Sequence, residues 1–131
     1  MLLTFAYAHC ATVCPILVRD ALGAQATLRE ETSDGGPAVL VVTLDPWRDT
    51  PARLPHIARA WGMPSDAYLL GGGVAEVEAV LDAWSVPRTR DPSTGEITHA
   101  SIVYVLDEGG RIAYMASSGG ARALAELVRR L

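Results

Sequence analysis

Apolar residues recur along the chain with two periodicities, which predict alternating strands and helices. Continuous apolar runs at 2–7 and 38–44 predict strands buried on both faces. Between them, apolar positions spaced three and four apart predict a helix that begins at Pro15, since proline suits the first helical position. That stripe consists of Leu17, Ala21, Ala24 and Leu28. The same two rules predict a helix after Thr50–Pro51, a strand at 67–70, a helix over 77–84, a hairpin of 100–107 with 111–117, and a helix over 124–131.

This order of elements predicts an α/β fold. An early strand–helix–strand unit implies a parallel strand pair with a right-handed crossover, and the late hairpin adds antiparallel strands. We therefore expect a thioredoxin-like domain over residues 1–131, with a central mixed β-sheet and helices on both faces. Residues 90–96 are expected to form a polar loop. Because the first strand starts at the beginning of the sequence, it could be left as an exposed apolar edge.

Composition narrows the classes of function. The 131 residues carry a net charge of −4, from 11 basic and 15 acidic residues, so nothing indicates the basic face that nucleic acid would need. Two cysteines are too few for a disulfide scaffold or a four-cysteine zinc site. No apolar run approaches the roughly 20 residues of a membrane span, and no signal peptide precedes the first strand.

Both cysteines lie where the first strand gives way to the first helix. Cys10 is predicted in the loop and Cys14 at the helix N-terminus, ahead of its first turn, where the helix dipole favours thiolate. Three residues separate them, one more than in a thioredoxin motif. The pair could be structural, could form a redox-active disulfide, or could bind a metal together with a third ligand. Two thiolates and an imidazole form a soft donor set that suits copper.

Three histidines could supply that imidazole. His9 adjoins Cys10 and is expected to point away from it, since neighbours in an extended segment alternate. His56 is expected on a solvent-facing part of a helix. His99 precedes an apolar strand on the side of the fold that faces the cysteines, so it is either a ligand or a loop residue bonded to the backbone. Asp45 ends the central strand at the same sheet edge and could orient a ligand or contact a partner.

Four segments resemble the Sco/SenC family of thioredoxin-fold copper chaperones, which assist assembly of the binuclear copper centre of cytochrome c oxidase. They are "FAYAHCATVCP", "VVTLDPWRDTP", "AYLLGGGVAEVEAVLDAW" and "ITHASIVYVLDEGG". The resemblance implies that Cys10, Cys14 and His99 are copper ligands and gives Asp45 a functional role. It also implies a periplasmic or other extracytoplasmic location, usually with a membrane anchor and an N-terminal segment, neither of which appears in this sequence. Where the family usually has an aspartate before the metal histidine, this chain has Thr98.

Two functions follow as hypotheses. As a chaperone, the protein would bind Cu(I) or Cu(II) and pass it to the copper-bearing subunit of cytochrome c oxidase or another copper-accepting protein. As a thiol–disulfide oxidoreductase, Cys10 and Cys14 would exchange with a partner's cysteines and be reset by a thiol–disulfide reductant. The sequence favours the chaperone, and for the oxidoreductase it does not decide whether Cys10 or Cys14 would attack. Arg48 and Asp49 are expected to pair and stiffen the loop after the central strand.

Overall fold

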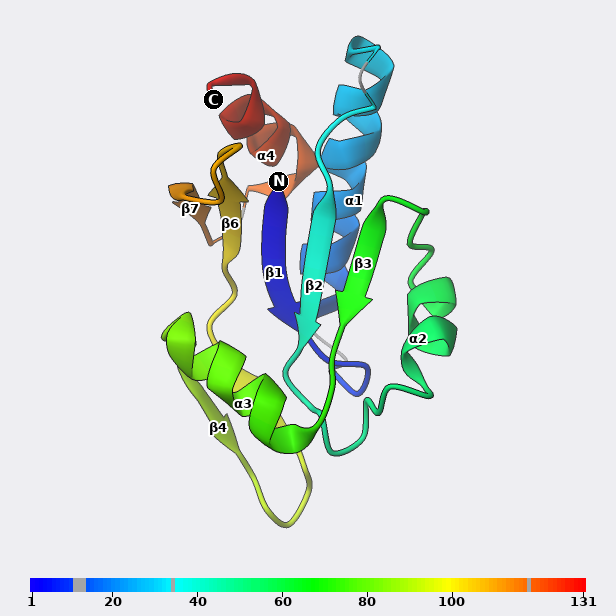
Figure 1. Cartoon of the computed structure of the whole chain (residues 1–131), viewed down its shortest axis with the longest axis vertical. Coiled ribbons are helices and arrows are strands. Elements are labelled where there is room, and N and C mark those ends of the chain that lie inside the picture. The colour runs from blue at the N-terminus through cyan, green and yellow to red at the C-terminus, as the bar shows by residue number, and fades with distance from the viewer. Residues whose placement is uncertain (11–13, 34, 118) are drawn as a thin grey trace.

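Five strands of the protein form one mixed sheet in the order β3-β2-β1-β6-β7 (Figure 1). The fold is taken from a computed structural model that describes residues 1–10, 14–33, 35–117 and 119–131. Within this part of the chain the strands are β1 (Leu2–Ala6), β2 (Val39–Thr43), β3 (Ala67–Leu70), β4 (Arg88–Arg90), β5 (Ile97–His99), β6 (Val103–Leu106) and β7 (Ile112–Ala116). The helices are α1 (Cys14–Glu31), α2 (Leu54–Ala60), α3 (Val74–Ala83) and α4 (Gly120–Arg129).

β1 lies in the middle of the sheet. It pairs in parallel with β2 and antiparallel with β6, and all five of its residues are buried. β2 pairs in parallel with β3, and β6 pairs antiparallel with β7. The expectation that β1 could form an exposed edge is therefore wrong, because a strand with partners on both sides has no unpaired backbone edge.

Helices cover both faces of the sheet, as the thioredoxin-like prediction requires. α1 and α4 lie side by side behind the sheet in Figure 1, with the buried Leu17, Ala21 and Leu124 in the core. On the other face the Trp84 ring, which follows α3, lies 6.4 Å from the Phe5 ring and 5.4 Å from the Tyr104 ring. These aromatic contacts fix the end of α3 over the carboxyl-terminal half of β1.

The sequence prediction missed a two-stranded ribbon. β4 and β5 pair antiparallel, with Arg88 opposite His99 and Arg90 opposite Ile97, apart from the main sheet. The predicted polar loop is the turn of this ribbon, closed by a hydrogen bond from the Asp91 N–H to the Glu96 carbonyl at 2.8 Å. Strands of three residues are too short to show an alternating pattern, so the sequence offered only the turn.

Several predicted boundaries also move: the helix expected over 77–84 is α3 at Val74–Ala83, and the helix expected over 124–131 is α4 at Gly120–Arg129. The helix expected from Pro51 begins at Leu54, because the Thr50 carbonyl accepts from Arg53 and Leu54 in a turn that precedes α2. The strand expected from residue 100 begins at Val103. No helix in the described part of the chain combines the length and apolar character that a membrane span requires.

Candidate metal centre

The candidate site lies where the parallel strands β1 and β2 end. Their register pairs Ala6 with Thr43, so the loops that follow them emerge at the same edge of the sheet. A hydrogen bond of 2.9 Å from the Leu44 N–H to the Ala6 carbonyl holds these two loops together at their start. In Figure 1, α3 and the β4–β5 ribbon lie beyond this edge. Open α/β sheets bind their ligands at such carboxyl ends.

Cys10 closes a tight turn after β1. Its N–H donates to the Tyr7 carbonyl at 3.2 Å, and its half-buried side chain packs against the core. Cys14 is the first residue of α1 rather than a cap ahead of it, a difference of one position. Its backbone therefore starts the helix, as a thiolate-stabilising position requires. The Cys14 side chain, and with it the predicted pairing of the two sulfurs, lies outside the described part of the structure.

His99 ends β5 and faces the strand that leads to Cys10. Its half-buried ring meets the Tyr7 ring edge-on, with centroids 5.9 Å apart and planes inclined by 74°. His99 Nδ1 lies 2.9 Å from the Ala100 carbonyl oxygen. Because a carbonyl can only accept, this hydrogen bond requires the proton on Nδ1. A neutral ring in this tautomer carries its lone pair on Nε2, which is one of the two ring nitrogens that can ligate a metal.

Tyr7 is a positioning residue that the sequence analysis did not single out. It is 3% exposed, and its hydroxyl both donates to the Ile97 carbonyl at 3.1 Å and accepts from the Ile97 N–H at 3.2 Å. It thus fixes β5 to the end of β1, with Cys10 three residues further along. Only a polar aromatic at the end of an apolar strand could have indicated this role, and that pattern is common in ordinary cores.

Asp45 connects the second loop to the ribbon that carries His99. Its carboxylate is fully buried and accepts from Arg48 Nε at 2.5 Å. The same guanidinium donates from Nη2 to the Gly95 carbonyl in the β4–β5 turn at 2.6 Å. The predicted Arg48–Asp49 pair is therefore wrong, since Arg48 pairs with Asp45. Asp45 acts on the ribbon through Arg48, and its proposed contact with a ligand or partner stays a prediction.

Asp49 holds the other loop instead. Its Oδ2 accepts from the Ala8 N–H at 3.1 Å and from the Thr43 hydroxyl at 2.8 Å, and the residue is 1% exposed. The carboxylate thereby ties the turn before Cys10 to the end of β2. The "DPWRD" stretch is thus a double clamp, in which Arg48 holds the β4–β5 turn and Asp49 holds the cysteine loop.

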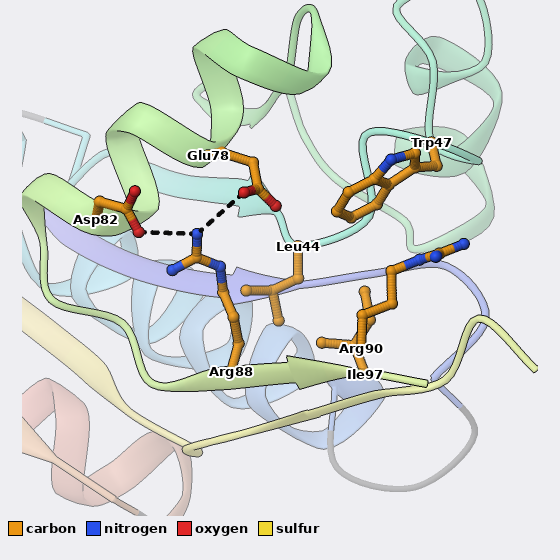
Figure 2. A pocket seen from close by; sticks show the side chains of 7 residues that line it. All are labelled: Leu44, Trp47, Glu78, Asp82, Arg88, Arg90 and Ile97. Atoms are coloured by element: carbon orange, nitrogen blue, oxygen red, sulfur yellow. Dashed lines mark hydrogen bonds and ion pairs between the residues drawn. The ribbon is translucent and has the colours of Figure 1, made fainter. Parts of the chain in front are cut away.

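A pocket of about 300 Å³ lies between α3, the β2–α2 loop and the ribbon (Figure 2). Arg88 of β4 points between two carboxylates of α3, at 3.0 Å from Asp82 and 3.8 Å from Glu78. Arg90 lies over the Trp47 ring, 4.6 Å from its centroid. Both arginines of β4 are therefore bound to neighbouring elements, and the pocket wall holds the ribbon in place.

The two other histidines and Thr98 are all exposed, but they lie in different parts of the fold. His56 is exposed on α2, as predicted. His9 is exposed in a turn, so the extended geometry assumed for residues 9 and 10 is wrong. Thr98 is exposed between the buried Ile97 and the half-buried His99. Because side chains alternate along a strand, an aspartate at 98 would project from the opposite side of the ribbon, and its charge would act on the site only from a distance.

The β4–β5 turn is itself stiffened by local hydrogen bonds. The Ser93 hydroxyl and N–H donate to Asp91 Oδ1 at 2.7 Å and 2.8 Å. These bonds, first that from the Ser93 side chain, hold the pKa of Asp91 below its usual value. The turn therefore presents the Gly95 carbonyl to Arg48 in a defined orientation. Gly95 has a φ of 76°, which favours glycine, and a Cβ there would approach the Arg48 guanidinium to 3.1 Å.

The family model and the similar solved structures point to the same protein family. The SCO1/SenC family model matches residues 1–131. Copper-bound ScoI from Arabidopsis thaliana superposes with a TM-score of 0.83 at 16% identity, covering 99% of this chain and 83% of that one. A SCO1/SenC family lipoprotein from Bacillus anthracis gives 0.80 at 19%, covering 99% and 79%. Copper-bound ScoI from Bradyrhizobium japonicum gives 0.77 at 24%, covering 98% and 82%. No curated protein sequence matches the chain.

Proposed function

The chain belongs to the SCO1/SenC family, and we propose that it is a copper chaperone that binds one copper ion through Cys10, Cys14 and His99. The observation that carries the proposal is the position of His99, whose ring contacts Tyr7 at the end of the strand that leads to Cys10. Its Nδ1 proton is committed to a carbonyl, which orients Nε2 as a ligand. The A. thaliana and B. japonicum ScoI proteins, which share this fold, were solved with copper bound.

The donor set explains why copper is the cargo. Two thiolates and an imidazole prefer soft and borderline ions, and they can hold copper in both oxidation states. Binding requires both thiols to lose their protons, and the start of α1 stabilises the thiolate of Cys14. A site with three protein ligands leaves room for a ligand from an acceptor protein. The ion can then move by stepwise exchange of ligands without entering solution.

We further propose that the acceptor is the copper-bearing subunit of cytochrome c oxidase and that transfer takes place outside the cytoplasm. The family resemblance of the four motifs supports the acceptor. The B. anthracis relative is described as a lipoprotein, which supports the location. The redox state of the cysteine pair would control loading, because joining the two sulfurs in a disulfide removes two electrons and two protons and leaves no thiolate for copper.

A second candidate function is thiol–disulfide exchange with a partner. It is supported by the half-buried Cys10 in a loop and by Cys14 at the first position of a helix, the arrangement of an attacking and a resolving thiol. In that reaction one thiolate attacks a partner's disulfide to form a mixed disulfide and releases one partner thiol. The other cysteine then attacks the mixed disulfide, which forms the Cys10–Cys14 disulfide and releases the partner's second thiol. His99 has no role in these steps, so the two functions can be separated by mutation.

A transfer assay tests the chaperone function. Reduced protein loaded with one equivalent of Cu(I) is mixed with the copper-free soluble domain of the oxidase subunit, and the metal in each protein is measured after separation. We expect copper to move to the acceptor. We also expect Cys10→Ser to lower the affinity for copper at least about tenfold, since loss of a group that only supports a metal ligand already costs this much. His56→Ala is the matched control and should load and transfer normally. Retention of copper by the loaded protein, with reduction of the acceptor's disulfide, would favour the oxidoreductase.

A further inference from the structure

A histidine and two aspartates beside the cysteine loop form a second group of potential metal ligands. His9, Asp45 and Asp49 each offer one ligand atom, and these atoms all lie within 4.8 Å of one another. His9 comes from the turn after β1, and the two aspartates come from the loop after β2. The group therefore draws on both loops at the sheet edge, and it shares no side chain with the Cys10, Cys14 and His99 set.

Only one of the two carboxylate oxygens of Asp49 is hydrogen-bonded among the described residues. Its Oδ2 accepts two hydrogen bonds, from Ala8 and Thr43, whereas its buried Oδ1 has no hydrogen-bond partner among the residues that the structure describes. A buried carboxylate oxygen without a partner is costly, and native proteins rarely retain one unless an ion, water or ligand completes it. The clamp function of Asp49 uses Oδ2 alone. Oδ1 therefore calls for a further partner at this position.

A ring nitrogen of His9 lies near the two carboxylates without bonding to them. Within the described residues no hydrogen bond or ion pair joins His9 to Asp45 or Asp49, although their ligand atoms lie within 4.8 Å. Ligands at about 2.0–2.2 Å from one ion can be up to about 4 Å apart. The exposed His9 side chain needs only a small adjustment to reach that spacing. An ion bound between these groups would give the Asp49 carboxylate a further partner.

The local charge also favours a cation. The group holds two buried carboxylates, and one of them, Asp45, pairs with the Arg48 guanidinium, which also donates to the Gly95 carbonyl. Asp45 keeps lone pairs for a further ligand, since each carboxylate oxygen can accept more than one partner. Among the described residues Asp49 forms no ion pair, so its carboxylate has no cationic partner. Such a site attracts a divalent ion without requiring Arg48 to leave.

We propose that His9, Asp45 and Asp49 form a second metal site, which binds a divalent first-row transition ion. One nitrogen and two oxygen donors are harder than a pair of thiolates, so this site selects Cu²⁺ or Zn²⁺ and does not favour Cu⁺. Cu²⁺ binds most tightly among the divalent ions at such ligands. The inference does not depend on the proposed chaperone function, because it requires neither cysteine nor His99.

The test first removes the two thiolates of the proposed Cys10, Cys14 and His99 site. In the 131-residue protein with Cys10→Ser and Cys14→Ser, Cu²⁺ alone is titrated by calorimetry, and the bound ion is examined by electron paramagnetic resonance. We expect one Cu²⁺ per chain with hyperfine coupling to one nitrogen. Adding His9→Ala should lower the affinity at least about tenfold, given the cost of losing even a supporting group. His9 is exposed, so this variant should retain the fold, which circular dichroism checks.

Matched histidine variants complete the design. In the same cysteine-free background, His99→Ala and His56→Ala should leave the affinity and the nitrogen coupling unchanged, and Asp49→Asn should weaken binding as His9→Ala does. The proposal is overturned if the cysteine-free protein binds no Cu²⁺, if His9→Ala binds it as well as its parent, or if His99→Ala removes the binding. Failure here leaves copper binding by the cysteines untouched, because that is measured in protein with both thiols present.

Discussion

Replacing His99 with alanine is expected to weaken copper binding by the reduced protein at least about tenfold, while thiol–disulfide exchange by Cys10 and Cys14 continues. The ring is held by its edge-on contact with Tyr7 and by the hydrogen bond from Nδ1 to the Ala100 carbonyl. Removing it takes away the only nitrogen ligand in the proposed set. Loss of a residue that merely orients a ligand already costs about tenfold to a hundredfold in metal affinity.

The affinity of this variant is measured by anaerobic competition with a Cu(I) chelator, and thiol–disulfide exchange is measured on a model disulfide. His56→Ala is the control, because His56 is exposed on α2 and has no part in the proposed site. Unchanged copper affinity in His99→Ala would refute the three-ligand model. Loss of disulfide exchange in His99→Ala would show instead that the ring serves the cysteine chemistry.

Replacing Arg48 with alanine should lower the free energy of unfolding by about 3 kcal/mol, which is the largest loss of stability that we predict. The fully buried Asp45 carboxylate would lose its partner, and breaking a buried ion pair from one side costs about 3–5 kcal/mol. The lower end applies because the Arg48 side chain is 28% exposed. The Gly95 carbonyl would also lose its donor, so the ribbon that carries His99 should loosen.

Urea unfolding of the metal-free protein measures this loss, and a copper titration of the folded variant measures the effect on the site. Arg19→Ala is the matched control, since Arg19 contacts Asp20 at 3.9 Å and its side chain is 76% exposed. A pair of that kind contributes about 0–1 kcal/mol. If Arg48→Ala were as stable as Arg19→Ala, the clamp between the β2–α2 loop and the ribbon would have no energetic weight.

The main sheet could be predicted from the sequence because its central strands have unambiguous composition. The runs at 2–7 and 38–44 are continuous and apolar, as strands buried on both faces must be, and they became β1 and β2. The parallel crossover between them placed the ends of both strands, with Cys10 and Asp45, at one edge. The helix at Pro15 followed from spacing and from proline's preference for a helix start.

The attachment of His99 to the site could not be predicted from the sequence. It depends on β4 and β5, whose three residues each show no period, and on Tyr7, whose hydroxyl bonds to a backbone 90 residues away. The partner of Arg48 was likewise decided by tertiary geometry, since Asp45 and Asp49 are both near it in sequence. Local patterns predict elements, whereas the Tyr7–Ile97 and Arg48–Gly95 hydrogen bonds form only when distant segments meet.

X-ray absorption at the copper edge, on reduced protein loaded anaerobically with one equivalent of Cu(I), tests the central claim most directly. The proposed site predicts two sulfur scatterers and one nitrogen scatterer with the outer-shell pattern of an imidazole, and it predicts that the imidazole pattern disappears in His99→Ala. A spectrum without sulfur, or an imidazole pattern that persists unchanged in His99→Ala, would contradict copper binding by Cys10, Cys14 and His99.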